Sequence, residues 1–389
     1  MTDPTVTIVT PSYNQGEFIR ATIESVLSQE YPHLEYIVMD GGSTDGTAAI
    51  AAEYAGRLTW VSEKDRGQSH AINKGFKMAK GDIVAWLNSD DILLPGAVTR
   101  AVRAFEQAPG TGAIYGEGYL MDREGQVTGR FPATEPFNLW RLANVRDYVL
   151  QQSTFFRRSA VEEVGWLDEH LHYALDWDLL IRLGLKFGLH YIPESLGVLR
   201  EYPDAKTFSG GDKRIEEIRR VLQRHTGLKR APGYRAYGLD TLQRRWRAKL
   251  VNNVPQWLRP AGAALYLPVY VATTLVIMRN LRDQGLYTEG WASDRLKWML
   301  PEGSGEIVVR GRLPDHIALR GAILSASAGG RQLGRWPLTA GDFEVRFSGP
   351  DRKRPFSFEL HCSRYRRAWT GIGALGKVTF QLQSATWAR

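Results

Sequence analysis

The sequence predicts an α/β protein in three parts, in which a parallel sheet is followed by a basic helical segment and a small antiparallel β domain. Short β-branched apolar runs alternate with amphipathic stretches up to about residue 96, as in repeated β-α-β units. Basic clusters fill the chain from Asp212 to Arg259, and Gly-punctuated strand patterns follow from about Pro301. The expected domains are therefore residues 1–210, 211–300 and 301–389.

Strands and helices alternate with short loops in the first part. Each predicted helix begins beside Gly, Ser or Asp residues, which suit turns and helix N-termini. After Ala97 the alternation is less regular, and strands outnumber helices. We expect strands at 6–10, 35–40, 58–62, 83–87, 113–121, 126–131 and 153–157, and helices at 16–28, 47–54, 68–79, 97–105 and 176–187.

The middle part ends in an uncharged stretch, Pro260–Met278, between Arg259 and Arg279. A helix that spans a bilayer needs ~20 apolar residues, and Gly262 and Pro268 weaken this stretch further. A transmembrane span is therefore the least favoured interpretation. A helix at a membrane surface and a solvated helix packed by a core helix remain open, with nearly equal weight. The third part has the strand spacing of a β-sandwich or jelly roll.

Composition limits the class of protein. The 389 residues are 43% hydrophobic and 24% charged, which excludes wholesale disorder and a polytopic membrane protein. Cys362 is the only cysteine, so no intrachain disulfide or multi-cysteine metal site exists, and a reducing compartment is indicated. The N-terminus lacks the pattern of a signal peptide, and we expect a cytoplasmic protein.

The net charge points to an anionic partner. Fifty Lys and Arg residues stand against 42 Asp and Glu residues, a formal charge of +8. Nucleic acid, an anionic membrane surface and a phosphorylated substrate all fit this charge. The basic block contains Tyr237 and Trp246 but no recognised nucleic-acid-binding motif, so nucleic acid ranks last.

Two polar segments follow the first two predicted strands. They are Thr10–Asn14 and Asp40–Thr47. Ligands of open α/β sheets bind at the carboxyl ends of the strands. There Asp40 is placed to accept from a base N–H and Tyr13 to stack on a ring, although either segment alone is also typical of an ordinary turn. Neither contains G-x-G-x-x-G, and the chain has no G-x-x-x-x-G-K-[ST] loop.

Two further acidic segments are candidates for chemistry. Asn88-Ser89-Asp90-Asp91 follows the apolar run 83–87, where paired carboxylates suit a hard divalent cation held with substrate phosphates. Asp90 is the preferred ligand, and capping of the next helix is equally compatible with the spacing. Asp176 and Asp178 open a predicted helix, where one carboxylate could act as a general base. On spacing alone, helix capping is favoured there by roughly three to one.

In this order the three segments resemble the family 2 glycosyltransferases, of the bacterial polysaccharide or O-antigen type. VTIVTPSYNQGEFIRATIESVLSQEYPHLEYIVMDGGSTDGT is similar to the family's nucleotide-binding half, and KDRGQSHAINKGFKMAKGDIVAWLNSDD to the segment ending in its metal-binding motif. The resemblance covers roughly residues 5–207. It implies a GT-A fold with a Rossmann-like mixed sheet, a nucleoside-diphosphate sugar donor, Mn²⁺ or Mg²⁺, and inversion at the anomeric carbon.

The resemblance also assigns residues to roles. It implies that Asp176 is the catalytic base and that Asp90, with Asp91, binds the metal. The predicted acceptor side is Gln152, His172 and Tyr173, within polar loops that are also compatible with simple turns. The donor would contact Pro11, Ser12, Tyr13, Asp40, Lys64, Asp65, Arg66, Gln68, Asn88, Ser89, Arg200 and Lys206.

Two positions depart from the family pattern. Asn88 stands where many members carry the first aspartate of the metal motif, so metal binding would depend on Asp90 and Asp91. Tyr202 stands where relatives often carry histidine, which removes the basis for a metal role of that loop. Arg200 and Lys206 remain expected diphosphate contacts.

The expected function is hexosyl transfer to a hydroxyl of a glycan or lipid-linked glycan, in polysaccharide or lipopolysaccharide synthesis at the inner face of a membrane. The alternative is a noncatalytic protein that binds carbohydrate or nucleotide sugar, against which Asp90 and Asp176 argue. The β domain could bind glycan, contact the catalytic part or mediate oligomerisation. Its aromatic residues are as compatible with a core as with a ligand platform; they are Trp336, Tyr365, Trp369 and Trp387.

Overall fold

A computed structural model divides the chain into two compact units. The first unit comprises residues 1–137 and 147–210, and the second comprises residues 138–146 and 211–389. Residues 138–146 thus leave the first unit in mid-sequence, which the sequence pattern did not indicate. The structure describes residues 3–206, 210–252, 254–281, 291–293, 295–313, 321–350, 355–363, 366–369 and 375–388.

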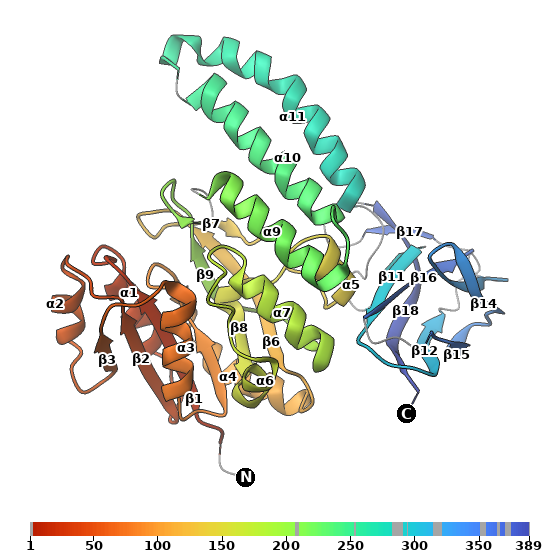
Figure 1. Ribbon diagram of the computed structural model, residues 1–389, viewed down its shortest axis with the longest axis horizontal. Coiled ribbons are helices and arrows are strands. Elements are labelled where there is room, and N and C mark those ends of the chain that lie inside the picture. The colour runs from red at the N-terminus through yellow and green to blue at the C-terminus, as the bar shows by residue number, and fades with distance from the viewer. Residues whose placement is uncertain are drawn as a thin grey trace. The chain divides into compact units, whose positions relative to one another are not determined.

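A nine-stranded mixed sheet forms the centre of the first unit, in the order β3-β2-β1-β4-β8-β6-β9-β5 with β7 beside β6 (Figure 1). The first four strands are parallel, and β8 runs antiparallel to both β4 and β6. This confirms the predicted mixed α/β sheet. The strands are β1 (Val6–Ser12), β2 (Leu34–Asp40), β3 (Thr59–Ser62), β4 (Ile83–Trp86), β5 (Ile92–Leu93), β6 (Ala113–Met121), β7 (Val127–Arg130), β8 (Thr154–Arg157) and β9 (Leu189–Arg200).

Helices cover both faces of this sheet. Their bounds agree with the predicted ones to within three residues wherever a helix was expected. Helix α6 was not expected, and it ends at Gly165 in the left-handed region (φ 92°), a common helix terminus. The helices of the first unit are α1 (Ile19–Leu27), α2 (Thr47–Ala52), α3 (Gln68–Met78), α4 (Ala97–Gln107), α6 (Arg158–Val164) and α7 (Leu175–Lys186).

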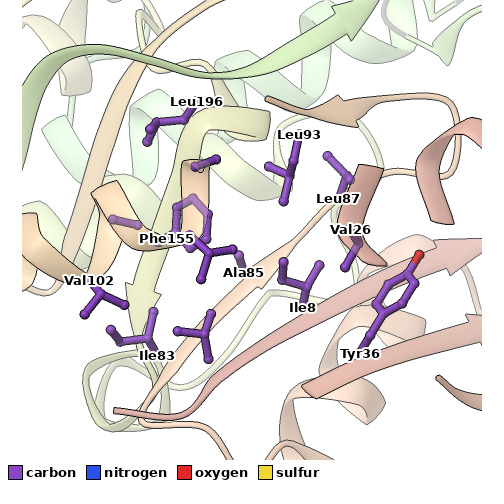
Figure 2. Close-up of a cluster of buried hydrophobic side chains, with 14 of the residues drawn as sticks. Ile8, Val26, Tyr36, Ile83, Ala85, Leu87, Leu93, Val102, Phe155 and Leu196 are labelled. Atoms are coloured by element: carbon purple, nitrogen blue, oxygen red, sulfur yellow. The ribbon is translucent and has the colours of Figure 1, made fainter. Parts of the chain in front are cut away.

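The core of the first unit follows from the two-residue period of strands and the three-to-four-residue period of helices. Ile8, Ile83 and Phe155 point from neighbouring strands into one cluster, which Val26 of α1 and Val102 of α4 complete (Figure 2). The opposite face packs on α3, and there the Trp86 and Phe156 rings stack with centroids 5.1 Å apart. The sheet is therefore buried on both sides, and its strand ends are left for loops.

The second unit begins with helices and ends in β strands. Its helices are α5 (Leu139–Asn144), α9 (Gly211–Thr226), α10 (Pro232–Arg247) and α11 (Arg259–Leu281), with a π-helical turn at Ala248–Asn252 and a 3₁₀ turn at Gln256–Leu258. Figure 1 shows α10 and α11 side by side. None of the helices in the described ranges is both long enough and apolar enough to cross a bilayer.

Two antiparallel sheets form the β domain, as predicted. One has the order β10-β18-β12-β15 with β17 beside β18, and the other β11-β16-β13-β14. Alternate residues of both face a common core that includes Val309, Phe347 and the buried Cys362. The strands are β10 (Trp291–Ser293), β11 (Arg295–Leu300), β12 (Glu306–Leu313), β13 (Ile323–Ala328), β14 (Arg331–Pro337), β15 (Gly341–Ser348), β16 (Phe356–Cys362), β17 (Arg366–Trp369) and β18 (Leu375–Trp387).

The β domain starts earlier than the predicted boundary at residue 301, because β10 and β11 already pair within its sheets. Of the four aromatic residues singled out, Trp336 packs against Phe347 with ring centroids 5.7 Å apart, which is a core role. Tyr365 and the side chains of Trp369 and Trp387 lie outside the described part of the chain.

Candidate active site

The two loops that follow β1 and β2 are joined by hydrogen bonds. The parallel register places Ser12 beside Asp40 at the ends of these strands. Beyond that point the Asn14 N–H donates to Ser43 Oγ (2.8 Å), and the Asn14 side chain accepts from the Thr44 N–H (2.9 Å). The predicted pair of segments is thus one continuous structure at the carboxyl edge of the sheet, where ligands of such sheets bind.

Asp40 holds the loop after β2 in place through hydrogen bonds. Its buried carboxylate accepts from both the N–H and the hydroxyl of Ser43, from the Gly42 N–H and from the Ser62 hydroxyl. These four donors fix the turn after β2 to the end of β3. In the structure Asp40 therefore shapes the loop on which a ligand would lie.

Tyr13 and Asp65 both approach Gly41, the first residue after β2, and these three residues are called the slot below. A Cβ at Gly41 would be 2.7 Å from the Asp65 carboxylate and 3.4 Å from the Tyr13 ring, so only glycine lets both approach. The Tyr13 side chain is 62% exposed, which leaves a ring face for stacking. The exposed Lys64 side chain passes Gly42 at the rim.

Beside the slot, the Pro11 ring and Ser12 are buried at the end of β1. The Ser12 hydroxyl is buried and has no hydrogen-bond partner among the residues that the structure describes. A buried hydroxyl without a partner costs free energy, which a ligand at this edge would recover. Gly41 was not among the predicted site residues. Its one available signal was its place directly after Asp40.

A pair of buried carboxylates follows β4. Asp91 is fully buried, and its oxygens accept from the Arg200 N–H (2.9 Å), Gln152 Nε2 (2.6 Å) and Asn88 Nδ2 (3.0 Å). Burial and then the neighbouring Asp90 charge raise the pKa of Asp91 to about 8, against these three donors. Burial likewise raises the pKa of Asp90, whose carboxylate accepts from the Tyr202 hydroxyl (2.8 Å). Two crowded carboxylates favour a cation at this position.

A chain of hydrogen bonds connects this pair to the last residues of the first unit. Lys206 Nζ donates to Gln68 Oε1 (2.6 Å), and Gln68 Nε2 donates to Asn88 Oδ1 (2.7 Å). Asn88 in turn donates to Asp91. The structure therefore brings Gln68, Asn88 and Lys206 together beside Asp91. All three were predicted to contact the sugar donor. Ser89 is buried within the same turn.

Arg200 occupies a different position from the predicted diphosphate contact. Its buried guanidinium donates to the carbonyl oxygens of Asp90 (2.8 Å), Asp122 (3.1 Å) and Arg123 (2.7 Å). It also lies 4.9 Å from the centroid of the Phe18 ring. These contacts hold the Asp90 turn in place. We propose that Arg200 positions this turn, a role that differs from the predicted contact with the diphosphate.

Arg200→Lys should lower the stability of the first unit by about 2–4 kcal/mol, because an ammonium group cannot reach three carbonyl groups in the same geometry. The measurement is urea unfolding of the full chain. Arg123→Lys is the matched control: Arg123 is partly exposed and pairs with the exposed Glu17 (2.7 Å), a contact that solvent screens. Equal losses in both variants would contradict the positioning role.

The predicted acceptor residues are divided by the structure. Gln152 is buried and donates to Asp91, so it supports the carboxylate pair rather than facing a cleft. His172 is exposed and Tyr173 is half-buried, and their rings meet edge to face with centroids 4.7 Å apart. Both stand in the loop directly before Asp176. Of the three predicted acceptor residues, only His172 and Tyr173 therefore reach the surface.

Asp176 and Asp178 have separate environments in the first turn of α7. Asp178 is fully buried and pairs with Arg182 (2.8 Å), whose remaining nitrogens donate to the Val164 and Trp166 carbonyls. Asp176 is half-buried and accepts from the Trp177 N–H (2.8 Å). The Arg182 pair therefore identifies Asp178 as the structural carboxylate and leaves Asp176 as the candidate base.

The first turn of α3 joins these parts into one site. Ser69 Oγ donates to the Leu171 carbonyl (3.0 Å), and Arg66 pairs with Glu169 (2.5 Å), which secures the loop that leads to Asp176. Gln68, between them, contacts the Asn88 turn. The loop that leads to Asp176 and the turn that follows β4 thus both contact residues 66–69.

The residues present suit a divalent cation bound together with substrate phosphates. Asp90 and Asp91 offer carboxylate oxygens, the ligands of Mg²⁺ and Mn²⁺, and their buried repulsion is relieved by positive charge. No cluster of three His, Cys, Asp or Glu side chains with metal-binding geometry occurs in the part of the chain that the structure describes. A cation held by few protein ligands and completed by phosphate oxygens matches this donor set.

Comparisons with known proteins relate the chain to glycosyltransferases. The family described as "Glycosyl transferase family 2" matches residues 7–165. An uncharacterized glycosyltransferase of Mycobacterium tuberculosis is 34% identical over 186 residues, which are 47% of this chain and 70% of the relative. The poly-beta-1,6-N-acetyl-D-glucosamine synthase of Staphylococcus epidermidis is 28% identical over 197 residues, 47% of each chain.

Among solved structures, the mannosyltransferase PcManGT from Pyrobaculum calidifontis, in complex with GDP-Man and Mn²⁺, is 21% identical, with a TM-score of 0.48 over 72% of this chain and 88% of that one. The chain spans between 27% and 70% of the length of the curated relatives that it matches. The expected mixed sheet is confirmed in the first unit. The matched residues include both loops at the slot and the Asp90 turn, and the chain belongs to glycosyltransferase family 2.

Proposed function

We propose that this glycosyltransferase moves a hexose from a nucleoside-diphosphate donor to a hydroxyl group of a glycan or lipid-linked glycan, with inversion and with a divalent cation. The observation that carries the proposal is the common edge that holds the Tyr13–Asp65 slot, the Asp90–Asp91 pair and the loop before Asp176. A nucleotide, a diphosphate and a hydroxyl acceptor need three such adjacent surfaces.

The donor's base would lie in the slot, against the Tyr13 ring and the Gly41 backbone, where the Asp65 carboxylate can accept from a base N–H. Asp65 is held there by the Gly67 N–H, which donates to its other oxygen (2.7 Å). The free Ser12 hydroxyl and Pro11 would contact the ribose side. Lys64 and Lys206 place positive charge where the diphosphate would lie.

Asp90, supported by Asp91, would hold the cation. When bound, such an ion neutralises the charge that develops on a diphosphate leaving group. Asn88, Gln68 and Gln152 keep the carboxylate pair in place through their amide groups. Tyr202 donates to Asp90 at the same point and fixes the orientation of its carboxylate.

Asp176 would act on the acceptor. Its carboxylate accepts the proton of the acceptor hydroxyl as the oxygen forms its bond to the anomeric carbon. The bond from that carbon to the diphosphate oxygen breaks in the same step, and the diphosphate leaves with the bonding electrons. One displacement from the opposite side inverts the configuration. His172 and Tyr173, which precede Asp176, would contact the acceptor.

The proposed setting is the inner face of a membrane, in synthesis of polysaccharide or lipopolysaccharide. A lipid-linked acceptor presents its glycan at the membrane surface, where a peripheral enzyme can reach it. The basic and apolar helices of the second unit suit that location.

Nucleoside diphosphates with Mn²⁺ should raise the melting temperature of the full chain, because they bind only the folded state. Gly41→Val should weaken this binding at least about tenfold by occupying the space beside Tyr13 and Asp65, and it should cost about 1–3 kcal/mol of stability because its Cβ would displace the Asp65 carboxylate. Thermal unfolding with each diphosphate measures the shift in melting temperature. Isothermal titration measures the affinity. Gly46→Ala is the control, since its Cβ would meet open space on the same loop. No shift with any diphosphate would refute the proposed function.

A further inference from the structure

The α10–α11 pair has a polar joint. Gln243 in α10 is buried and donates to the Tyr270 carbonyl (3.2 Å) and to the Thr273 hydroxyl in α11. A Cβ at Gly262 would lie 1.7 Å from the Leu250 carbonyl oxygen, so glycine permits close contact with the turn after α10. Over residues 259–273, only Gly262 and Thr273 of α11 are buried. Between residues 259 and 272, most apolar side chains of α11 are therefore exposed rather than buried against α10.

Those apolar side chains lie on the surface. Leu265 is 67% exposed, and Leu267, Tyr270 and Val271 are exposed beside it. Trp257, in the turn that leads into α11, is 77% exposed. No charged residue interrupts the sequence from Pro260 to Met278. A continuous apolar surface of this kind in a soluble chain marks a site of interaction.

The charge around this surface has one sign. Residues 241–281 contain six basic residues and no Asp or Glu. Arg245 pairs with Asp212 (2.7 Å), whereas the exposed Arg247, Lys249 and Arg259 take part in no ion pair within the described ranges. These three cations stand in or beside the turns that join α10 to α11, next to the exposed Trp246 and Trp257.

We propose that the α10–α11 pair lies in the headgroup layer of an anionic phospholipid bilayer. Arg247, Lys249 and Arg259 would contact lipid phosphates, while Leu265, Leu267 and Val271 would enter the boundary with the acyl chains. Trp residues favour this interface because the indole has an apolar body and a polar N–H. A second copy of the chain is disfavoured as the occupant, since two uniformly basic surfaces repel each other.

The proposal extends the proposed function, because a bound bilayer is where a lipid-linked acceptor would be presented. Its test is independent of catalysis. The full chain is sedimented with vesicles of phosphatidylcholine alone and with vesicles containing about a third phosphatidylglycerol, at low and at high salt. We expect binding at least about tenfold stronger to the anionic vesicles, and weakened by salt.

Two variants locate the contact. Exchange of Arg247, Lys249 and Arg259 for Gln should lower binding at least about tenfold, and Leu265→Glu with Leu267→Glu should do the same. Both sets lie at exposed positions, so the fold should tolerate them. The matched control exchanges three exposed β-domain residues, Arg312, Arg331 and Arg335, for Gln and should bind as the wild type does.

Equal binding to neutral and anionic vesicles would overturn the proposal, and so would unchanged binding of the two helix variants. A self-association that Leu265→Glu with Leu267→Glu abolishes, seen by analytical ultracentrifugation without vesicle binding, would assign the surface to a second copy instead. Vesicle binding without any diphosphate binding would refute the proposed function and leave this inference standing. Diphosphate binding without vesicle binding would refute this inference and leave the proposed function standing.

Discussion

Asp176→Asn is expected to lower kcat for sugar transfer about 10³-fold, because an amide cannot accept the proton of the acceptor hydroxyl. Donor binding should be unchanged, since the slot and the carboxylate pair are built from other elements. Initial rates at saturating donor, together with the donor Kd from titration, measure the two effects separately. Asp176 is half-buried in the first turn of α7, so the variant should fold normally.

Asp178→Asn provides the contrast within the same turn. Asp178 is fully buried against Arg182, and its loss leaves a charged guanidinium without its carboxylate. That variant should lose stability, and its remaining folded fraction should keep near-normal kcat. If Asp176→Asn transferred sugar at the wild-type rate, Asp176 would not be the base.

Asp90→Asn should abolish the part of diphosphate affinity that depends on Mn²⁺ and lower kcat by about 10³-fold. The neutral amide still accepts from the Tyr202 hydroxyl, so the turn should keep its shape. Titration of a nucleoside diphosphate with Mn²⁺ and with excess EDTA separates the metal-dependent affinity from the rest. The wild type in EDTA should behave as Asp90→Asn does with Mn²⁺.

Asp91→Asn should mainly lower the stability of the protein. In this fully buried site Asp91 Oδ2 accepts from Asn88 and Gln152, and Oδ1 accepts from the Arg200 N–H. An asparagine keeps one acceptor oxygen and turns its NH₂ group toward the donors on the other side. The expected loss of stability is about 2–4 kcal/mol, measured by urea unfolding. Identical stability of the Asp90 and Asp91 variants would show that the structural division between the two carboxylates is wrong.

The sequence was a good guide to elements whose local pattern agrees with their environment. β1, β2 and β4 are buried over most of their length, and the helices between the first strands are buried on one face, so their apolar periods are clean. β9 was not predicted, because Pro193 and Gly197 interrupt its pattern and its register with β6 shifts twice. Its last residue, Arg200, supplies the N–H that binds Asp91.

The sequence predicted the loops of the site but not the buried residues that hold these loops in place. The segments around Asp40, Asp90 and Asp176 stand out because polar residues follow apolar ones at strand or helix ends. The roles of Gln152 and Arg200 come from contacts between residues about 60 and 110 positions apart, which no local pattern records. Segment 138–146 was missed for the same reason, since its partners lie far along the chain.

That segment limits how the protein can be divided. Helix α5 packs on α9 and on β11; Asn138 donates to the Lys297 carbonyl (3.3 Å), and the Lys297 ammonium lies over the Trp140 ring. A fragment cut at residue 210 would keep the buried Leu139, Trp140 and Leu142 but lose α9 and β11, on which their helix packs. Such a fragment would expose an aggregation-prone helix in the middle of its sequence. The transferase half is thus not a transplantable module, and a shorter enzyme requires a new polypeptide link from Phe137 to Asp147.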